Sequence, residues 1–519
     1  MSDDQEASAN ESLTDRILDK IERVGNKLPH PIILFFMLAG LTLVFSWIVS
    51  LFEVAVEHPG TGETIQAINL LSRDGVRRIF SEAVPNFTGF APLGVVLVAM
   101  LGVGVADKSG LITAVLKKLI LGAPDKYITA AVIFAGIMSN LAADAGYVVL
   151  VPLGAIIFGA KGRHPLVGLA AAFAGVSGGF SANLLISSLD PMLAGITQEA
   201  AQLIESGYHV PPTVNWYFLV VSTFVITIVG TWVTEKIVAP RFDEYDGEEV
   251  DLGAEGETPE NIDKLSSPEI EGLKSAVLWL GICIILLLVM TVPETGLLRD
   301  DQGQLIRGMT PFVQGMVPII AIFFFVPGLA YGIKANTIES SDDVADFFSE
   351  TMADMGVYVA LAFAAGQFVA YFDWSNMGTI LSISGAEFLQ NIGFTGLPLV
   401  IVFIIVSGFI NIFIGSASAK WAVMAPVFVP MLMQLGYSPE FAQMAYRVGD
   451  SVTNIISPLM PYFAIIIAFA KKYDEDLGIG TLISTMLPYS VAFLLVWTVL
   501  LAIWFIGGLP IGPGGTLFY

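Results

Sequence analysis

Apolar residues run in long blocks along most of this chain, and polar residues gather in a few short segments. The first apolar block runs from Pro31 to Phe52, and four more follow near 90–106, 127–160, 166–197 and 213–239. A second set lies near 274–292, 311–333, 354–372, 376–390, 396–435, 440–470 and 480–508. A helix of about 20 apolar residues crosses a hydrocarbon core of about 30 Å. The pattern therefore predicts an all-α polytopic membrane protein.

The polar segments divide the chain into four parts. Residues 1–30 form an N-terminal segment, in which apolar positions at helical spacing from Leu13 to Leu28 predict an amphipathic helix on the membrane surface. Lys20, Arg23 and Lys27 precede the first span and place the N-terminus in the cytoplasm. A first membrane half (31–240), an acidic polar loop (241–273) and a second membrane half (274–510) follow.

Composition excludes several classes of protein. Of the 519 residues 55% are hydrophobic and 14% are charged, and the mean hydropathy is +0.74, which is too apolar for a soluble globule. The net charge of −23 lies largely between Met1 and Asp15 and between Asp243 and Glu271, so we read it as solvated segments. A basic surface interleaved with aromatic residues is lacking, so we expect no nucleic-acid partner.

The two membrane halves share a sequence pattern. The segment DAGYVVLVP ends at Pro152, and the similar segment SAKWAVMAP ends at Pro426. GGFSANLLISSLDP likewise resembles GDSVTNIISPLMP, with Asn183 and Asn454 in matching places at nearly the same offset along the chain. We infer an internal repeat with broken helices at 175–197 and 447–467. Paired segments interrupted by Gly and Pro in two halves are typical of a secondary-transporter site.

The broken segments carry oxygen atoms at membrane depth. Unwound backbone survives there only where protein buries it or where water and substrate reach it. Its carbonyls, the amide oxygens of Asn183 and Asn454 and the hydroxyls of Ser181 and Thr453 are ligands suited to Na⁺. The alternative is that these groups only bond neighbouring backbone and line helix contacts.

Ionisable residues flanked by apolar sequence give the next signal, because each is costly inside a bilayer. They are Asp144, Asp190, Lys420, Arg447 and Asp450. Arg447 and Asp450 are three positions apart and are predicted to pair on one helical face, from which Arg447 could exchange Asp450 for an anionic substrate. Asp190 has no opposite charge nearby in sequence, so it either carries a proton or is a cap or turn residue at the interface. Trp421 is either an interfacial aromatic or a stacking face for an aromatic substrate.

One segment fits an enzyme motif. Gly175–Gly179 (GVSGG) matches the G-x-S-x-G pattern, which would make Ser177 a nucleophile. Such a serine needs a base, and the four histidines lie in polar connections or at span edges. A Walker-type phosphate loop is lacking. We therefore predict a transporter and no enzyme.

Three segments carry a family resemblance: SASAKWAVMAPVFVPML, YSPEFAQMAYRVGDSVTNIISPLMPYF and SGGFSANLLISSLDPMLAG. They resemble the AbgT family of p-aminobenzoyl-glutamate transporters over nearly the whole membrane region. The resemblance implies a homodimer in the bacterial inner (cytoplasmic) membrane, with about nine transmembrane helices and two re-entrant hairpins per protomer in inverted repeats. Positions important for transport in the family fall on Asp190, Ser418, Trp421, Pro439, Arg447, Asp450 and Pro458.

The same resemblance implies a function. The expected activity is secondary active transport of p-aminobenzoyl-glutamate, a small aromatic carboxylate from folate breakdown, with efflux of sulfonamide antimetabolites as a further activity. We expect no cofactor and a coupling ion that is H⁺ or Na⁺. Arg447 would hold a carboxylate, Trp421 would stack on the benzoyl ring and Asp190 would couple movement to protons. The alternatives are an ion-coupled transporter of another small anion, such as a dicarboxylate, and, more distantly, an intramembrane serine hydrolase.

Overall fold

The computed structural model describes residues 29–57, 64–142, 146–242, 265–305, 310–458, 460, 462–474 and 477–519. Asp144, Pro461, the amphipathic helix expected before residue 29 and most of the acidic loop lie outside these ranges. The described chain is mostly helical, with one short hairpin of β1 (Ala55–Glu57) and β2 (Thr64–Gln66). This confirms the predicted fold class.

Seven helical segments in the described residues are long and apolar enough to cross a membrane. They are α2 (Pro31–Leu51), α3 with α4 (Arg73–Thr88 and Ala91–Lys108), α10 with its continuation (Trp216–Arg241), α12 (Ser267–Thr291), α14 (Met316–Ala335), α16 (Gly356–Trp374) and α22 (Ile479–Gly507). An eighth span results if α5 (Leu111–Leu121) is joined to the helix Asp125–Ser139, which bends away from it by 115°. The expected count of nine helices and two hairpins stays a prediction.

Helix α12 shows why these segments fold as they do. Its first turn carries a capping box, in which Ser266 and Glu269 each accept a backbone N–H of the other residue. Apolar residues then cover its outer face, and Val277, Ile285 and Val289 are 68%, 62% and 63% exposed. Such a surface requires lipid, because water would not tolerate an apolar face of this length.

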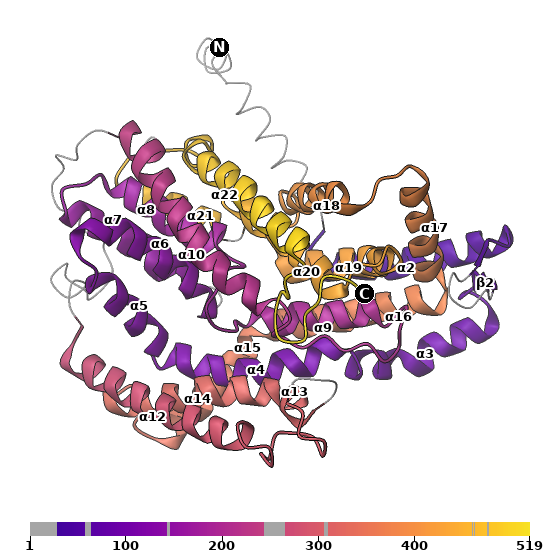
Figure 1. The fold of residues 1–519 in the computed structure, drawn as a ribbon, viewed down its shortest axis with the longest axis horizontal. Helices are drawn as coiled ribbons and strands as arrows, with labels where there is room; N and C mark the ends of the chain where they lie inside the picture. Colours follow the sequence, from indigo (N-terminus) through magenta and orange to yellow (C-terminus); the bar gives the residue numbers. More distant parts are fainter. Residues whose placement is uncertain are drawn as a thin grey trace, which may run out of the picture.

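Shorter helices fill the centre of the molecule in two matching sets. The first comprises α6 (Ile128–Ser139), α7 (Val151–Ala160), α8 (Pro165–Phe173) and α9 (Leu189–Ala201). The second comprises α18 (Gly396–Asn411), α19 (Ala417–Gln434), α20 (Pro439–Asn454) and α21 (Phe463–Ala470). Pro165 and Pro439 each stand in the first turn of their helix, at the same offset as Pro152 and Pro426. Figure 1 shows α9, α19 and α20 together in the middle, with α12 and α14 beside α4 along one edge.

Glycine contacts repeat in the two halves. A Cβ atom on Gly175 would overlap the carbonyl oxygen of Ile133, and one on Gly449 would overlap the carbonyl oxygen of Ile404. The two glycines are as far apart in sequence as the two helix-starting prolines, and the two isoleucines are as far apart as the two matching asparagines. Helices approach this closely only where a side chain is missing. The shared geometry supports the predicted repeat, whereas its inverted sense stays a prediction.

The remaining described elements connect these helices. They are α13 (Pro311–Gln314), α15 (Ser341–Asp354), α17 (Met377–Asn391), the 3₁₀ turns η2 (Asp125–Tyr127), η3 (Asn140–Ala142) and η7 (Ala239–Arg241), and the π turns η4 (Gly146–Leu150), η5 (Ala174–Gly178) and η6 (Thr234–Val238). Single π turns inside helical segments are frequent at functional sites. Two of the three, η4 and η5, lie in the first of the two matching sets.

Candidate substrate site

A cavity of about 310 Å³ lies between the two broken segments. Among the described residues, no helix lies between η5 and Leu189 in the first segment or between Asn454 and Phe463 in the second. The cavity is lined by residues from both halves: Asn140, Tyr147, Phe180, Ser188, Leu189, Met192, Gly415, Ser416, Ala417, Ser418, Asn454, Met460 and Tyr462. Its size falls in the range of small-molecule sites, and its lining mixes apolar walls with a few polar groups.

Two buried ion pairs lie next to this cavity, and they differ from the predicted pairing. Arg447 Nη1 lies 2.6 Å from Asp190 Oδ1, and Lys420 Nζ lies 2.5 Å from Asp450 Oδ1. All four side chains are at most 2% exposed. The prediction that Arg447 pairs with Asp450 is therefore wrong. Helix α20 is buried on all sides, so Arg447 and Asp450 meet partners on different neighbouring helices.

Asp190 also differs from its predicted state. It lies in the first turn of α9, where the backbone N–H and the hydroxyl of Ser187 donate to its Oδ2 at 2.6 and 2.9 Å. Arg447 donates to its other oxygen. Three donors therefore surround its two oxygens at the N-terminus of α9. The expectation that Asp190 has no charged partner is wrong, because its partner comes from the far half of the sequence, whereas its role as a proton carrier stays a prediction.

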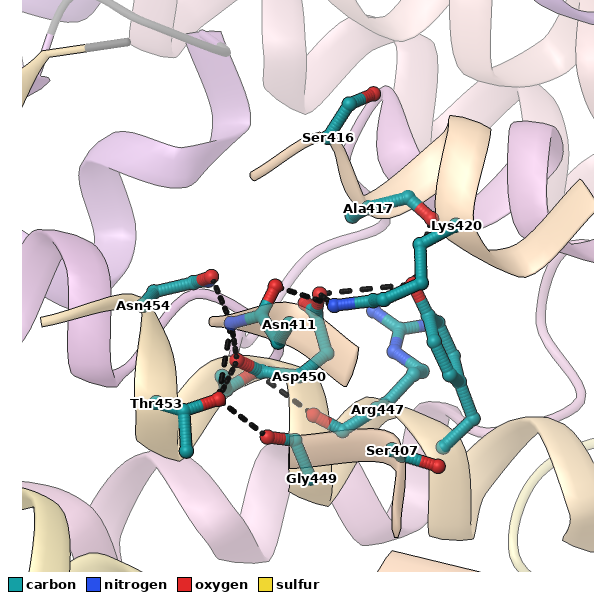
Figure 2. Close-up of polar contacts among 12 residues, drawn as sticks. Ser407, Asn411, Ser416, Ala417, Lys420, Arg447, Gly449, Asp450, Thr453 and Asn454 are labelled. Atoms are coloured by element: carbon teal, nitrogen blue, oxygen red, sulfur yellow. Dashed lines mark hydrogen bonds and ion pairs between the residues drawn. The ribbon is translucent and has the colours of Figure 1, made fainter. Parts of the chain in front are cut away.

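The second ion pair belongs to a network around Asn411, which sequence reasoning missed (Figure 2). The side-chain nitrogen of Asn411 lies 2.8 Å from the Asp450 carbonyl oxygen, 2.9 Å from Thr453 Oγ1 and 2.7 Å from Asn454 Oδ1. Its side-chain oxygen accepts from Lys420 Nζ. A lone amide at the end of the apolar run 396–410 was the available signal. This network joins the end of α18 to α19 and α20.

Trp421 does not occupy its predicted interfacial position. It is fully buried in the protein and stacks on Tyr446, with ring centroids 4.4 Å apart and an interplanar angle of 26°. Its indole N–H donates to Thr197 Oγ1 at 2.8 Å. It is not among the residues lining the cavity. The interfacial position is therefore wrong, whereas the role as a stacking face for an aromatic substrate stays a prediction.

The aromatic residues that stack at the cavity are Tyr147 and Tyr462. Their ring centroids are 4.6 Å apart, with an interplanar angle of 6°. Tyr147 belongs to η4 in the first half and Tyr462 precedes α21 in the second. The sequence analysis noted Tyr147 only as part of the repeat. These two residues, and not Trp421, present a stacked aromatic surface to the cavity.

The other predicted site residues lie in different places. Ser418 and Asn454 line the cavity, and Pro458 lies in the break after α20. Pro439 begins α20 and, at about 1.5 Å per residue, lies roughly 22 Å along the helix from Asn454. It therefore acts on the start of the helix and not on the cavity.

The predicted sodium ligands form two groups. Thr453 Oγ1 and Asn454 Oδ1 each receive a bond from Asn411. In the first half, Asn183 Oδ1 accepts from the N–H of Leu185, whereas the Asn183 side-chain nitrogen and the Ser181 hydroxyl are buried without a hydrogen-bond partner in the described structure. The role of all four as cation ligands stays a prediction.

The sequence matches a known family over most of its length. The family model described as the AbgT putative transporter family matches residues 16–519. The chain belongs to the AbgT family. It is 39% identical over 494 residues to the p-aminobenzoyl-glutamate transport protein of Escherichia coli (strain K12), covering 95% of each chain.

Two solved structures resemble this AbgT-family transporter over almost its full length. The Alcanivorax borkumensis YdaH transporter, described as having an unusual topology, is 43% identical with a TM-score of 0.88, covering 93% of this chain and 100% of that one. Neisseria gonorrhoeae MtrF, described as illuminating a class of antimetabolite efflux pumps, is 46% identical with a TM-score of 0.90, covering 96% of this chain and 100% of that one. Both confirm the suspected family.

Within this AbgT-family transporter, the two halves share one asparagine-to-backbone hydrogen bond but differ in what contacts the side-chain oxygen of that asparagine. The side-chain nitrogen of Asn140 donates to the Val176 carbonyl oxygen at 3.0 Å, and that of Asn411 donates to the Asp450 carbonyl oxygen at 2.8 Å. The two donor asparagines are as far apart in sequence as Ile133 and Ile404. The two acceptor residues are as far apart as Gly175 and Gly449. In the second half the ammonium of Lys420 reaches the Asn411 oxygen. The corresponding Asn140 oxygen is buried and has no partner among the described residues.

The serine of the rejected hydrolase motif has a structural contact. Ser177 is fully buried in η5, and its hydroxyl lies 3.4 Å from the sulfur of Met460. A thioether is not a general base, and a nucleophilic serine requires one within hydrogen-bond reach. The geometry therefore agrees with membership of a family of transport proteins.

Proposed function

We propose that this AbgT-family transporter is a secondary active transporter of p-aminobenzoyl-glutamate-type aromatic carboxylates, with efflux of sulfonamide antimetabolites as a related activity, and that an H⁺ or Na⁺ gradient drives it. The names of its relatives support the substrate class. The observation that carries the proposal is a cavity shared by both broken segments, whose lining combines the stacked Tyr147 and Tyr462 with hydroxyl and amide groups.

The cavity suits a ligand that is aromatic at one end and polar at the other. A benzoyl ring would pack against Tyr147 and Tyr462, since aromatic pairs prefer offset or edge-on contact. Ser416, Ser418 and Asn454 would hydrogen-bond the amide or carboxyl groups. Polar groups of this kind fix the orientation of a ligand in an apolar pocket.

The substrate carboxylates would compete with protein carboxylates for the two buried cations. Arg447 is held by Asp190, and Lys420 by Asp450. A guanidinium can bind a carboxylate through two N–H groups. An incoming substrate carboxylate could therefore replace the Arg447 bond to Asp190. We therefore assign Arg447 to a substrate carboxylate through exchange with Asp190, in place of the exchange with Asp450 expected from sequence.

Coupling to Na⁺ would use the Asn140 side-chain oxygen in the first half, which has no partner among the described residues. The buried Asn140 oxygen occupies the place where the second half binds the Lys420 ammonium, so a free monovalent cation would complete it. Asn183, Ser181, Asn454 and Thr453 are the further oxygen ligands to test. Coupling to H⁺ through Asp190 would require that its ion pair with Arg447 break first.

Transport by purified protein in proteoliposomes tests the proposal. Uptake of radiolabelled p-aminobenzoyl-glutamate should exceed uptake of succinate, and an imposed H⁺ or Na⁺ gradient should accelerate it. Preference for succinate would favour the dicarboxylate alternative. Ser177→Ala should leave transport unchanged, whereas the hydrolase alternative requires that it abolish activity. The homodimer and the inner-membrane location are part of the proposal, and cross-linking in intact cells tests the dimer.

A further inference from the structure

Glu440 is a buried carboxyl without a cationic partner in the described structure. It lies in the first turn of α20 and is 2% exposed. Both of its carboxyl oxygens lie 3.0 Å from the hydroxyl of Tyr208, which belongs to the connection between α9 and α10. The neighbouring capping residue Ser438 is also neutral, and its hydroxyl donates to the Thr516 carbonyl oxygen at 2.6 Å. The two buried aspartates near the cavity, in contrast, each have a lysine or arginine within 2.6 Å.

Glu440 stands at the head of a polar row that runs along α20 to the cavity. The row continues through Gln443, Arg447, Ser451 and Asn454, at spacings of three or four positions. Residues at such spacings share one face of a helix. All five are at most 6% exposed, so the row is enclosed by protein along its whole length. One end of α20 is thus linked to the other by its own polar face.

A chain of hydrogen bonds connects this polar row to Trp421. The Trp421 indole N–H donates to Thr197 Oγ1 at 2.8 Å, and the Thr197 hydroxyl lies 2.6 Å from Gln443 Oε1. The Gln443 amide nitrogen donates to Asn215 Oδ1 at 2.8 Å, and the Asn215 amide nitrogen donates to the Glu440 carbonyl oxygen at 3.0 Å. The chain crosses α19, α9, α20 and the start of α10.

We propose that Glu440 is a proton-binding group of the transport cycle, and that this chain couples its protonation to the position of α20 and of the ion pairs on it. The inference rests on the proposed ion-driven transport. Amide groups do not pass protons along, so the coupling is positional. A neutral Glu440 can remain in the buried first turn at little cost in free energy. A charged Glu440 favours a conformation in which water reaches it. Each state therefore favours a different position of α20.

The surroundings of Glu440 support proton binding near neutral pH. Glu440 lies outside the helices long enough to span, and burial raises its pKa to about 7 although Tyr208 donates to it. Glu205 and Tyr519 face the same region, and the Tyr519 hydroxyl donates to Glu205 at 2.8 Å. His209 follows Tyr208, and burial lowers the pKa of its imidazole. None of these groups is a cation at pH 7.

The raised pKa of Glu440 also makes protein stability depend on pH. Between the ordinary carboxyl pKa and about 7, the folded state binds one proton more than the unfolded state. The contribution of Glu440 to stability is therefore fully present below the ordinary carboxyl range and is lost as pH rises toward 7.

A pH titration by infrared difference spectroscopy tests the proton site without any substrate. The wild-type protein in lipid should show a protonated-carboxyl band that disappears with a midpoint near pH 7, and Glu440→Gln should remove it. Tyr208→Phe deletes the side-chain donor that reaches Glu440 from another element, so the midpoint should rise by about one pH unit. Glu205→Gln, at an exposed carboxylate of the same region, is the matched control and should leave the band unchanged.

The coupling is tested in proteoliposomes with p-aminobenzoyl-glutamate. Glu440→Gln should lose uptake driven by an imposed proton gradient but retain exchange of labelled for unlabelled substrate, with a flat pH profile. A wild-type spectrum without the band, or a variant whose pH profile matches the wild type, overturns the proposal. If the wild type does not transport this substrate at all, the proposed function fails, while the infrared titration still decides whether Glu440 binds a proton.

Discussion

The ion pair between Asp190 and Arg447 allows a quantitative prediction. Its atoms are 2.6 Å apart and both side chains are at most 2% exposed, so removal of either partner leaves a buried charge. Such a loss costs about 3–5 kcal/mol of unfolding free energy. Arg447→Met should cost about 3 kcal/mol, because Asp190 keeps both donors from Ser187. Asp190→Asn should cost about 5 kcal/mol, because Arg447 loses its carboxylate while its Nε already has no partner in the described structure.

The double variant separates a true pair from two independent contributions. Asp190→Asn combined with Arg447→Met removes both charges, so its cost should fall well below the sum of the single costs. Unfolding in mixed micelles, followed by circular dichroism against denaturing detergent, measures all three. Asp125→Asn is the control, since the Lys161–Asp125 pair has the same 2.6 Å distance but is 46% and 77% exposed and should contribute under about 1 kcal/mol. Additive single costs would refute the pairing argument.

Three further predictions follow from close contacts and from the cavity. Gly449→Ala places a Cβ against the Ile404 carbonyl oxygen and should destabilise the protein by about 1–3 kcal/mol in the same unfolding assay, whereas Gly40→Ala meets open space and should not. Tyr462→Leu removes an aromatic wall of the cavity and should weaken p-aminobenzoyl-glutamate binding, measured by calorimetry, by about 0.5–1.5 kcal/mol; unchanged affinity would exclude ring stacking there. Arg447→Lys keeps the charge but loses the planar fork, so the same titration should show weaker binding, and equal affinity would count against bidentate recognition.

Sequence reasoning located the first span and the breaks well because both depend on local composition, whereas the helices α3, α5 and α15 fall outside the predicted apolar blocks. The first apolar block, Pro31 to Phe52, corresponds closely to α2, which ends at Leu51. The helical break at 179–188 falls inside the predicted segment 175–197, and the described non-helical residues 455–458, 460 and 462 fall inside the predicted segment 447–467. Runs of apolar residues and clusters of Gly, Pro and Asn determine these features within a short window of the chain.

The errors concern partners, which depend on how distant segments pack. A close spacing suggested the Arg447–Asp450 pair, but a helix enclosed by protein has potential partners on every side. Asp190 looked unpaired only because its arginine lies in the other membrane half. The interfacial position predicted for Trp421 rested on the usual preference of tryptophan for the membrane interface. Tertiary contacts with Tyr446 and Thr197 hold it inside the protein instead.

The two ion pairs have different consequences for movement, because they connect different parts of the fold. Lys420 and Asp450 lie on α19 and α20, so their bond stays within the second half. Asp190 lies on α9, so its bond to Arg447 joins the two halves and must break or travel whenever they move apart. Breaking it without replacement costs about 3–5 kcal/mol. A substrate carboxylate that takes Arg447 from Asp190 offsets that cost on one side of the pair, while Ser187 retains Asp190 on the other. Substrate binding would thereby release the link between the halves, which ties movement to occupancy of the site.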